Sequence, residues 1–219
     1  MSFCKTGLMG GSFNPIHNAH LQIAESARIA FSLDRVLFIP AADPPHKTLA
    51  GDVPFDVRCR MVELAIKGHE AFELSTIEGE RSGKSYSIDT IRAFNKRFPT
   101  DELFFIIGGD SFREIGLWHA YSAIFASCSI IVVERPGHEI IDPSGTLPVP
   151  IKGDFRHDKE GHRLIHYSGH SVYFLKGTPK EISSTEIRRL AASGDSITHL
   201  VPSDVAAYIS QQRIYSECP

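Results

Sequence analysis

Two histidines three residues apart are the side chains best suited to chemistry in this sequence. His17 and His20 lie in the stretch 10–20, which reads GGSFNPIHNAH. The apolar run 6–9 before it predicts a buried strand, and apolar residues at helical spacing over 21–31 predict a helix after it. The start of a helix favours negative charge, because its backbone N–H groups and its dipole point there. Two imidazoles at that point predict a phosphate-binding site.

The same residues have plainer explanations. Gly10 and Gly11 can simply form a tight turn, since the stretch is neither a GxGxxG nor a Walker loop. Either histidine alone can cap or pack a helix, and the pair could instead supply two ligands of a metal site. A metal site needs a further ligand, for which Asp110 is the candidate because it follows a buried strand. A His17–His20–Asp110 metallohydrolase is therefore an alternative.

A second concentration of polar groups opens a predicted helix near the C-terminus. Ser183, Ser184 and Thr185 are consecutive hydroxyls, and Arg188 follows within one turn of a helix that stops near Gly194. A serine or threonine N-cap explains the hydroxyls by itself. Together with the guanidinium, the hydroxyls also predict a second anion site.

Both stretches resemble the signatures of the nucleotidylyltransferase superfamily. The first resembles GxFxPxHxxH, with Ala19 where the usual form has glycine, and the second resembles ISSTxxR. The resemblance implies a catalytic role for His17, His20 and Arg188, with His20 near the α-phosphate of ATP and Arg188 on the β- and γ-phosphates. The residues that it places around ATP are Gly10, Gly11, Ser12, Phe13, Ile182, Ser183, Ser184 and Thr185.

Motifs between the two signatures resemble those of bacterial nicotinate-nucleotide adenylyltransferases. They are DPPHK at 43–47, SYSIDT at 85–90, IIGGDSF at 106–112, the tryptophan at 118 and ERPG at 134–137. Family members commonly have threonine where this chain has Ser87, and tyrosine where it has His119. The expected substrate-binding residues are His46, Lys47, Ser85, Tyr86, Ser87, Gly108, Asp110, Trp118 and Arg135.

Some of these residues also have a physical argument of their own. His46 and Lys47 follow the carboxyl end of a predicted strand, where ligands bind in open α/β sheets. Ser87 is a predicted N-cap, and the N–H groups of its helix could hold a carboxylate. Asp110 is a candidate for a ribose or a metal ion, and Trp118 offers a face for a ring to stack on. An ordinary polar loop, a helix cap and a core tryptophan are the alternatives.

The predicted elements alternate between strand and helix. Strands are expected at 6–9, 35–40, 72–75, 103–107, 129–134 and 172–175, with helices after most of them. This alternation predicts an α/β fold with a doubly wound parallel sheet of five to six strands, the Rossmann-like nucleotidyltransferase fold. We expect one domain over residues 1–219. Within it, 138–170 is expected to be a solvated surface excursion that holds no structural metal.

Composition limits the partners and the compartment. A net charge of −3 gives no hint of general nucleic-acid binding. The four cysteines are scattered without a CxxC pair, which is typical of reduced cysteines rather than disulfides or a zinc site. No apolar run approaches the roughly 20 residues of a membrane span, and no signal-peptide pattern is visible. We therefore expect a cytoplasmic protein with no membrane partner, and homo-oligomerisation stays open.

The resemblance implies one reaction, the transfer of AMP from ATP to nicotinate mononucleotide. The products would be nicotinate adenine dinucleotide and pyrophosphate. Mg²⁺ is expected through the substrate phosphates, because no dedicated carboxylate cage is visible in the sequence. Besides the metallohydrolase, the alternatives are nucleotidylyltransferases that act on nicotinamide mononucleotide, phosphopantetheine or glycerol phosphate.

Overall fold

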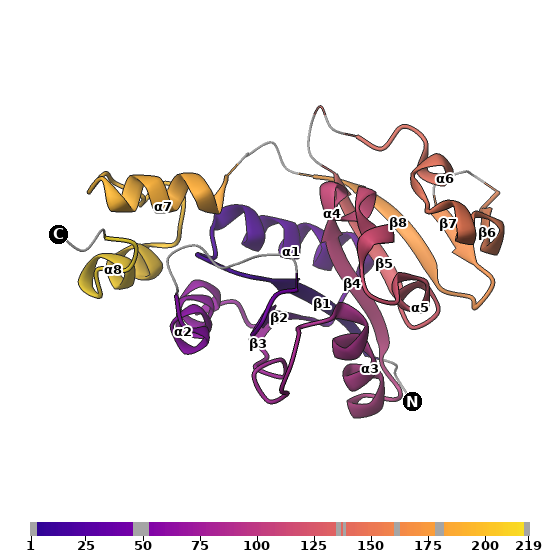
Figure 1. Cartoon of the computed structure of the whole chain (residues 1–219), viewed down its shortest axis with the longest axis horizontal. Helices are drawn as coiled ribbons and strands as arrows, with labels where there is room; N and C mark the ends of the chain where they lie inside the picture. Colours follow the sequence, from indigo (N-terminus) through magenta and orange to yellow (C-terminus); the bar gives the residue numbers. More distant parts are fainter. Residues whose placement is uncertain are drawn as a thin grey trace.

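Within the described residues, one sheet of eight strands in the order β3-β2-β1-β4-β5-β8-β7-β6 organises the chain (Figure 1). The computed structural model describes residues 4–45, 53–134, 137, 139–159, 163–177 and 182–216. The strands are β1 Lys5–Gly11, β2 Arg35–Pro40, β3 Phe72–Leu74, β4 Glu102–Gly108, β5 Ser129–Glu134, β6 Phe155–His157, β7 Arg163–His166 and β8 Ser171–Lys176. Strands β1 to β5 and β8 pair in parallel, whereas β6 and β7 pair antiparallel.

Helices cover both faces of the sheet. They are α1 Asn18–Phe31, α2 Phe55–Ile66, α3 Ser87–Arg97, α4 Gly109–Arg113, α5 Tyr121–Phe125, α6 Pro143–Thr146, α7 Ser184–Ala192 and α8 Ser203–Gln211, with 3-10 turns at Ile115–Leu117 and Val149–Asp154. Among the helices in these described ranges, none is both long and apolar enough to cross a membrane.

Side chains of the central strands alternate between two apolar layers. On β4, Phe104 and Ile106 belong to the first apolar layer, which is shared with α1, α2, α7 and α8. Phe105 and Ile107 belong to the second apolar layer on the opposite face, which is shared with α3, α4 and α5. The continuous apolar sequence of β4 follows from this burial on both faces, which is typical of a central parallel strand. The predicted doubly wound α/β architecture is confirmed.

The order of the strands determines where a ligand can bind. Neighbouring strands β1 and β4 leave the sheet in opposite directions, because β1 continues through α1 toward β2 and β4 continues through α4 toward β5. In open α/β sheets, ligands bind in the crevice beyond the carboxyl ends of the strands at such a switch point. The stretch after β1 that carries both histidines begins at this crevice.

The predicted number of strands is wrong, because the expected surface excursion 138–170 contains β6 and β7. These strands extend the sheet beyond β8 (Figure 1). The segment also buries Ile140, Leu147 and Leu164 in the second apolar layer. Its two strands escaped prediction because they have only three and four residues, too few to show a clear alternation of polar and apolar side chains.

The burial of Leu164 provides a test of this correction. The side chain is 1% exposed, so Leu164→Ala should lower the free energy of unfolding by about 2–5 kcal/mol. Tyr167→Ala is the matched control, since Tyr167 lies on the same segment and is 76% exposed. Urea denaturation measures both. If the two variants have the same free energy of unfolding, Leu164 is not packed in the core, and the correction to the predicted surface excursion is wrong.

Candidate active site

The two histidines contact each other at the start of α1. His17 is the N-cap residue, and its backbone N–H donates to Nδ1 of His20 at 3.2 Å. The rings stack with centroids 3.7 Å apart. Because Nδ1 of His20 accepts a hydrogen bond, the neutral ring carries its proton on Nε2, which is then a donor. His17 is buried and His20 half-buried, so His20 is the more accessible imidazole.

Backbone N–H groups at the start of α1 are less available to a phosphate than the sequence suggests. The N–H of Asn18 donates to the carbonyl of Leu200 at 2.9 Å, and the N–H of His20 donates to the carbonyl of His17 at 2.9 Å. The prediction that these N–H groups are free for an anion is therefore wrong for both residues. An anion at this point would therefore depend more on side chains than on the N–H groups of Asn18 and His20.

The loop between β1 and α1 places the ring of Phe13 against one of the histidines, His20. Phe13 has a positive φ of 45°, and its ring meets that of His20 edge to face with centroids 5.2 Å apart. A side chain at Gly11 would come within 3.1 Å of this ring, so a glycine is needed there for Phe13 to pack closely. Gly10, just before it, is exposed.

The second predicted anion site lies directly against this loop. Ser184 Oγ donates to the carbonyl of Pro15 at 3.1 Å. The Arg188 guanidinium donates to the carbonyl of Asn14 at 2.8 Å and to Oγ1 of Thr185 at 3.1 Å. The two signature segments, far apart in the sequence, are therefore joined by hydrogen bonds.

The hydroxyls of the second segment all take part in shaping it. Ser183 caps α7, as predicted, by accepting from the N–H of Thr185 at 3.2 Å. Ser184 and Thr185 are held by the contacts to Pro15 and Arg188 already described. Ile182, just before them, packs against the first apolar layer. These residues fix the start of α7 relative to the histidines.

The expected substrate-binding residues form a second group. Ser85 Oγ accepts from the N–H groups of Ala42 and Asp43, both at 3.0 Å. This contact ties the loop after β2 to the segment before α3. The ring of Tyr86 stacks on that of His119, with centroids 4.2 Å apart. The structure therefore brings the SYS motif together with the segment that follows Trp118.

The predicted N-cap of α3 is wrong by one residue. Ser87 is the first residue of the helix and Tyr86 is the N-cap. The carbonyl of Tyr86 accepts from the N–H groups of Asp89 and Thr90, at 3.1 and 3.3 Å, so the helix begins earlier than the serine suggests. The side chain of Tyr86 makes no capping hydrogen bond to this helix.

Gly108, Asp110 and Trp118 line the region beyond β4. A Cβ at Gly108 would meet nothing within 4 Å, so the end of this strand is open. Asp110 pairs with Arg113 at 3.2 Å. Trp118 is half-buried and meets Phe105 edge to face at 6.2 Å. His46, Lys47 and Arg135, the other predicted substrate contacts, lie outside the described residues.

Sequence reasoning missed two residues that hold the loop before α1. Arg58 is 1% exposed, and its guanidinium donates to the carbonyl of Ser12 at 2.7 Å. Burial lowers the pKa of this arginine. Tyr215 donates its hydroxyl proton to Oδ1 of Asn14 at 2.6 Å. Arg58 was detectable as a charged residue on the apolar side of a predicted helix, whereas nothing in the local sequence singles out Tyr215.

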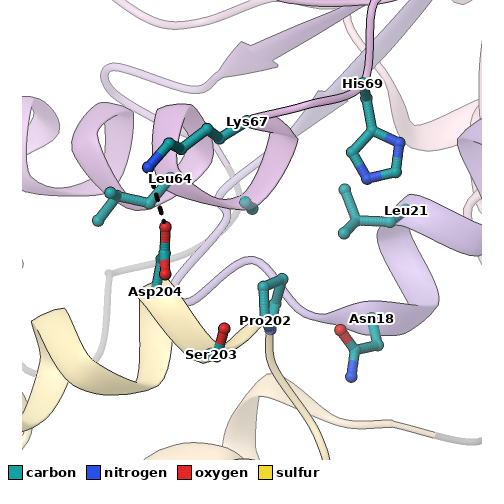
Figure 2. Close-up of a pocket in the computed structure, with 9 residues that line it drawn as sticks. Asn18, Leu21, Leu64, Lys67, His69, Pro202, Ser203 and Asp204 are labelled. Carbon is teal, nitrogen blue, oxygen red and sulfur yellow. Dashed lines mark ion pairs between the residues drawn. The ribbon is translucent and has the colours of Figure 1, made fainter.

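A cavity of about 340 Å³ lies between α1, α2 and the start of α8 (Figure 2). Lys67 and Asp204 pair across it at 3.5 Å. Its lining residues are Asn18, Leu21, Leu64, Ala65, Lys67, His69, Pro202, Ser203 and Asp204. His17, His20 and Arg188 are absent from this lining, so the cavity does not mark the candidate reaction centre.

Comparison with known proteins agrees with this geometry. Residues 8–190 match the cytidylyltransferase-like family model, a span that includes both signatures. A relative from Pelobacter propionicus is 62% identical over 98% of this chain and 100% of its own length, and one from Geobacter metallireducens is 56% identical over 97% and 98%. Both are named probable nicotinate-nucleotide adenylyltransferases.

The chain belongs to the nicotinate-nucleotide adenylyltransferase family. A solved structure with the same fold is the Plasmodium falciparum nicotinic acid mononucleotide adenylyltransferase complexed with NaAD, with a TM-score of 0.74, 19% identity and 97% of each chain covered. Membership of the adenylyltransferase family argues against the metallohydrolase alternative. In the described part of the chain, His17, His20 and Asp110 also form no group suited to a metal ion.

The geometry of His20 allows its two nitrogens to be tested separately. His20→Asn should keep an acceptor near the position of Nδ1 for the His17 N–H but removes Nε2, whereas His20→Ala removes both. We expect both variants to lose turnover by roughly 10²–10³-fold, the effect of removing one donor to a developing oxyanion. Only the alanine variant should lose stability, by about 1 kcal/mol. Steady-state kinetics and urea denaturation measure these effects, and normal turnover in His20→Asn would exclude a role for Nε2.

Proposed function

We propose that this adenylyltransferase transfers AMP from ATP to nicotinate mononucleotide, forming nicotinate adenine dinucleotide and pyrophosphate. One observation carries the proposal: the start of α7 is hydrogen-bonded to the loop before α1 through Ser184 and Arg188. Two phosphate-binding signatures thereby face one site, as a substrate with three phosphates requires. The names of the relatives support the same reaction.

The reaction requires the protein mainly to position the two substrates and to stabilise charge. The 5′-phosphate of the mononucleotide is already an anion at neutral pH, so its oxygen can attack the α-phosphorus of ATP without a general base. A bond forms between this oxygen and the α-phosphorus, and the bond from the α-phosphorus to the bridging oxygen breaks, releasing pyrophosphate. Catalysis then consists of alignment and stabilisation of the charge that develops on the phosphates.

His20 and Arg188 would provide this stabilisation at two places. The Nε2–H group of His20, oriented by the bond at Nδ1, would donate to the reacting α-phosphate. The guanidinium of Arg188, fixed by the carbonyl of Asn14, would meet the β- and γ-phosphates that become pyrophosphate. His17 would contact the triphosphate and support His20 through the stacked rings.

We expect Mg²⁺ to be required and to bind mainly through ATP. Mg²⁺ commonly uses one or two carboxylates together with substrate phosphates. Among the described residues, no three ligating side chains gather into a metal site, so phosphate oxygens would supply most of the ligands. When bound, the ion would neutralise charge on the triphosphate.

The start of α3 is suited to the carboxylate of nicotinate. Its N-cap, Tyr86, has no side-chain capping bond, which leaves the helix start able to receive an anion. The same tyrosine stacks on His119, and Trp118 lies on the neighbouring segment. A pyridine ring bound between these aromatic groups would direct its carboxylate toward Ser87.

The preference for the acid over the amide tests this assignment. With nicotinate mononucleotide, kcat/KM should exceed that with the nicotinamide form by at least roughly tenfold, because an amide NH₂ cannot accept the donated hydrogen bonds. Ser87→Ala should reduce the ratio, and Ser87→Thr should preserve it. Both mononucleotides, and phosphopantetheine as a third acceptor, are assayed with ATP and Mg²⁺ for dinucleotide and pyrophosphate. Equal values for acid and amide would contradict the carboxylate site.

Arg188 provides a test of the ATP side. Arg188→Ala should lower kcat/KM for ATP by roughly 10–100-fold, since a hydrogen bond to a charged group contributes about 1.5–3 kcal/mol. The KM for the mononucleotide should stay within about twofold of the wild type. Arg188→Lys keeps the charge but not the planar pair of donors. Its kcat/KM for ATP should therefore lie between those of the wild type and Arg188→Ala. Unchanged kinetics for ATP in the alanine variant would place Arg188 outside the phosphate site.

Two further expectations concern the whole protein. We propose that residues 1–219 form one domain and that the enzyme works in the cytoplasm. Light scattering on the purified enzyme would determine whether it forms a homo-oligomer.

A further inference from the structure

The loop before α1 is held by side chains from three distant parts of the chain. Arg58 of α2 binds the carbonyl of Ser12, Arg188 of α7 binds the carbonyl of Asn14, and Tyr215 after α8 binds the side chain of Asn14. Only Arg188 belongs to a signature. Arg58 and Tyr215 therefore raise the question of what they contribute to the site.

Tyr215 reaches the loop through an unusual backbone path. After α8 ends, Arg213 and Tyr215 both have positive φ, at 52° and 70°, a region that residues other than glycine seldom occupy. This path turns the tyrosine back toward the sheet, where it packs against the first apolar layer. Its hydroxyl lies 2.6 Å from Oδ1 of Asn14, a residue that is 2% exposed.

The surroundings keep this hydroxyl protonated. Burial raises the pKa of Tyr215, although the positive charges of Arg188 and Arg58 act in the opposite direction. The phenol is therefore a neutral donor at physiological pH, and Oδ1 of Asn14 is its acceptor. Asn14 thus receives Tyr215 on its side chain and Arg188 on its backbone.

We propose that Tyr215 is a positioning residue for the transfer reaction. By holding the side chain of Asn14, it fixes the loop that leads into His17 and His20 and orients the carbonyl to which Arg188 binds. The hydrogen bond from Tyr215 would thereby align His20, the proposed contact to the α-phosphate, with Arg188, the proposed contact to the β- and γ-phosphates. The kinetic part of this inference rests on the proposed function.

Tyr215→Phe removes the hydroxyl and keeps the ring, so it tests the hydrogen bond alone. We expect kcat/KM for ATP to fall roughly 2- to 10-fold, the equivalent of one lost hydrogen bond, with the KM for the mononucleotide unchanged. Tyr208→Phe is the matched control, because Tyr208 lies on α8 and packs in the same apolar layer. It should have wild-type kinetics, and both variants should have similar thermal midpoints.

A double-mutant cycle separates positioning from general support of the fold. In an Asn14→Ala background, Tyr215→Phe should cause no further loss, because its acceptor is gone. Hydrogen exchange measured by mass spectrometry gives a readout without activity: peptides covering residues 12–20 should exchange faster in Tyr215→Phe than in Tyr208→Phe. Unchanged kinetics and exchange in Tyr215→Phe, or additive losses in the cycle, would overturn the inference. A wild-type enzyme that forms no dinucleotide would instead overturn the proposed reaction, and the exchange experiment would still test Tyr215.

Discussion

The hydrogen bond from Arg188 to the carbonyl of Asn14 is the contact on which the candidate site depends. It joins the start of α7 to the loop before α1, and Ser184 adds a second bond between the same segments. A guanidinium bound at one side to the backbone loses little further freedom when it binds phosphate at the other, because its direction is already fixed. The guanidinium of Arg188 and the start of α7 are therefore held in place by contacts within the protein.

This preorganisation requires polar groups to be buried close to the apolar core. Arg58 is almost inaccessible, and a charge in such a place is tolerated only when its donors are satisfied. The carbonyls of Ser12 and Val53 accept from it. Because the loop residue Phe13 has a positive φ, the backbone needs such external supports to stay in one conformation. The buried arginine and the active-site loop thus stabilise each other.

The two halves of the site are built in different ways. On the proposed ATP side, hydrogen bonds between distant backbone and side-chain groups fix the histidines and Arg188. On the proposed acceptor side, the stacked rings of Tyr86 and His119 would provide the surface, and the start of α3 would provide the polarity. Aromatic stacking tolerates small shifts of a ring, whereas phosphate transfer requires alignment of the reacting atoms. In the proposed reaction, the more rigid construction would therefore lie where the bond changes.

The sequence by itself determined the parallel α/β core, both phosphate signatures and the family. Long apolar runs such as β4, and eleven consecutive residues of one motif, carry strong local information. Local patterns could not reveal β6 and β7, which are too short to show periodicity, or the start of α3, where the backbone of Tyr86 rather than a serine side chain begins the helix. Only the tertiary structure decided that the N–H of Asn18 is occupied by Leu200, and that Tyr215 and Arg58 reach the loop before α1. These contacts join residues far apart in the chain, and such pairings depend on how the packed elements meet rather than on the residues beside them.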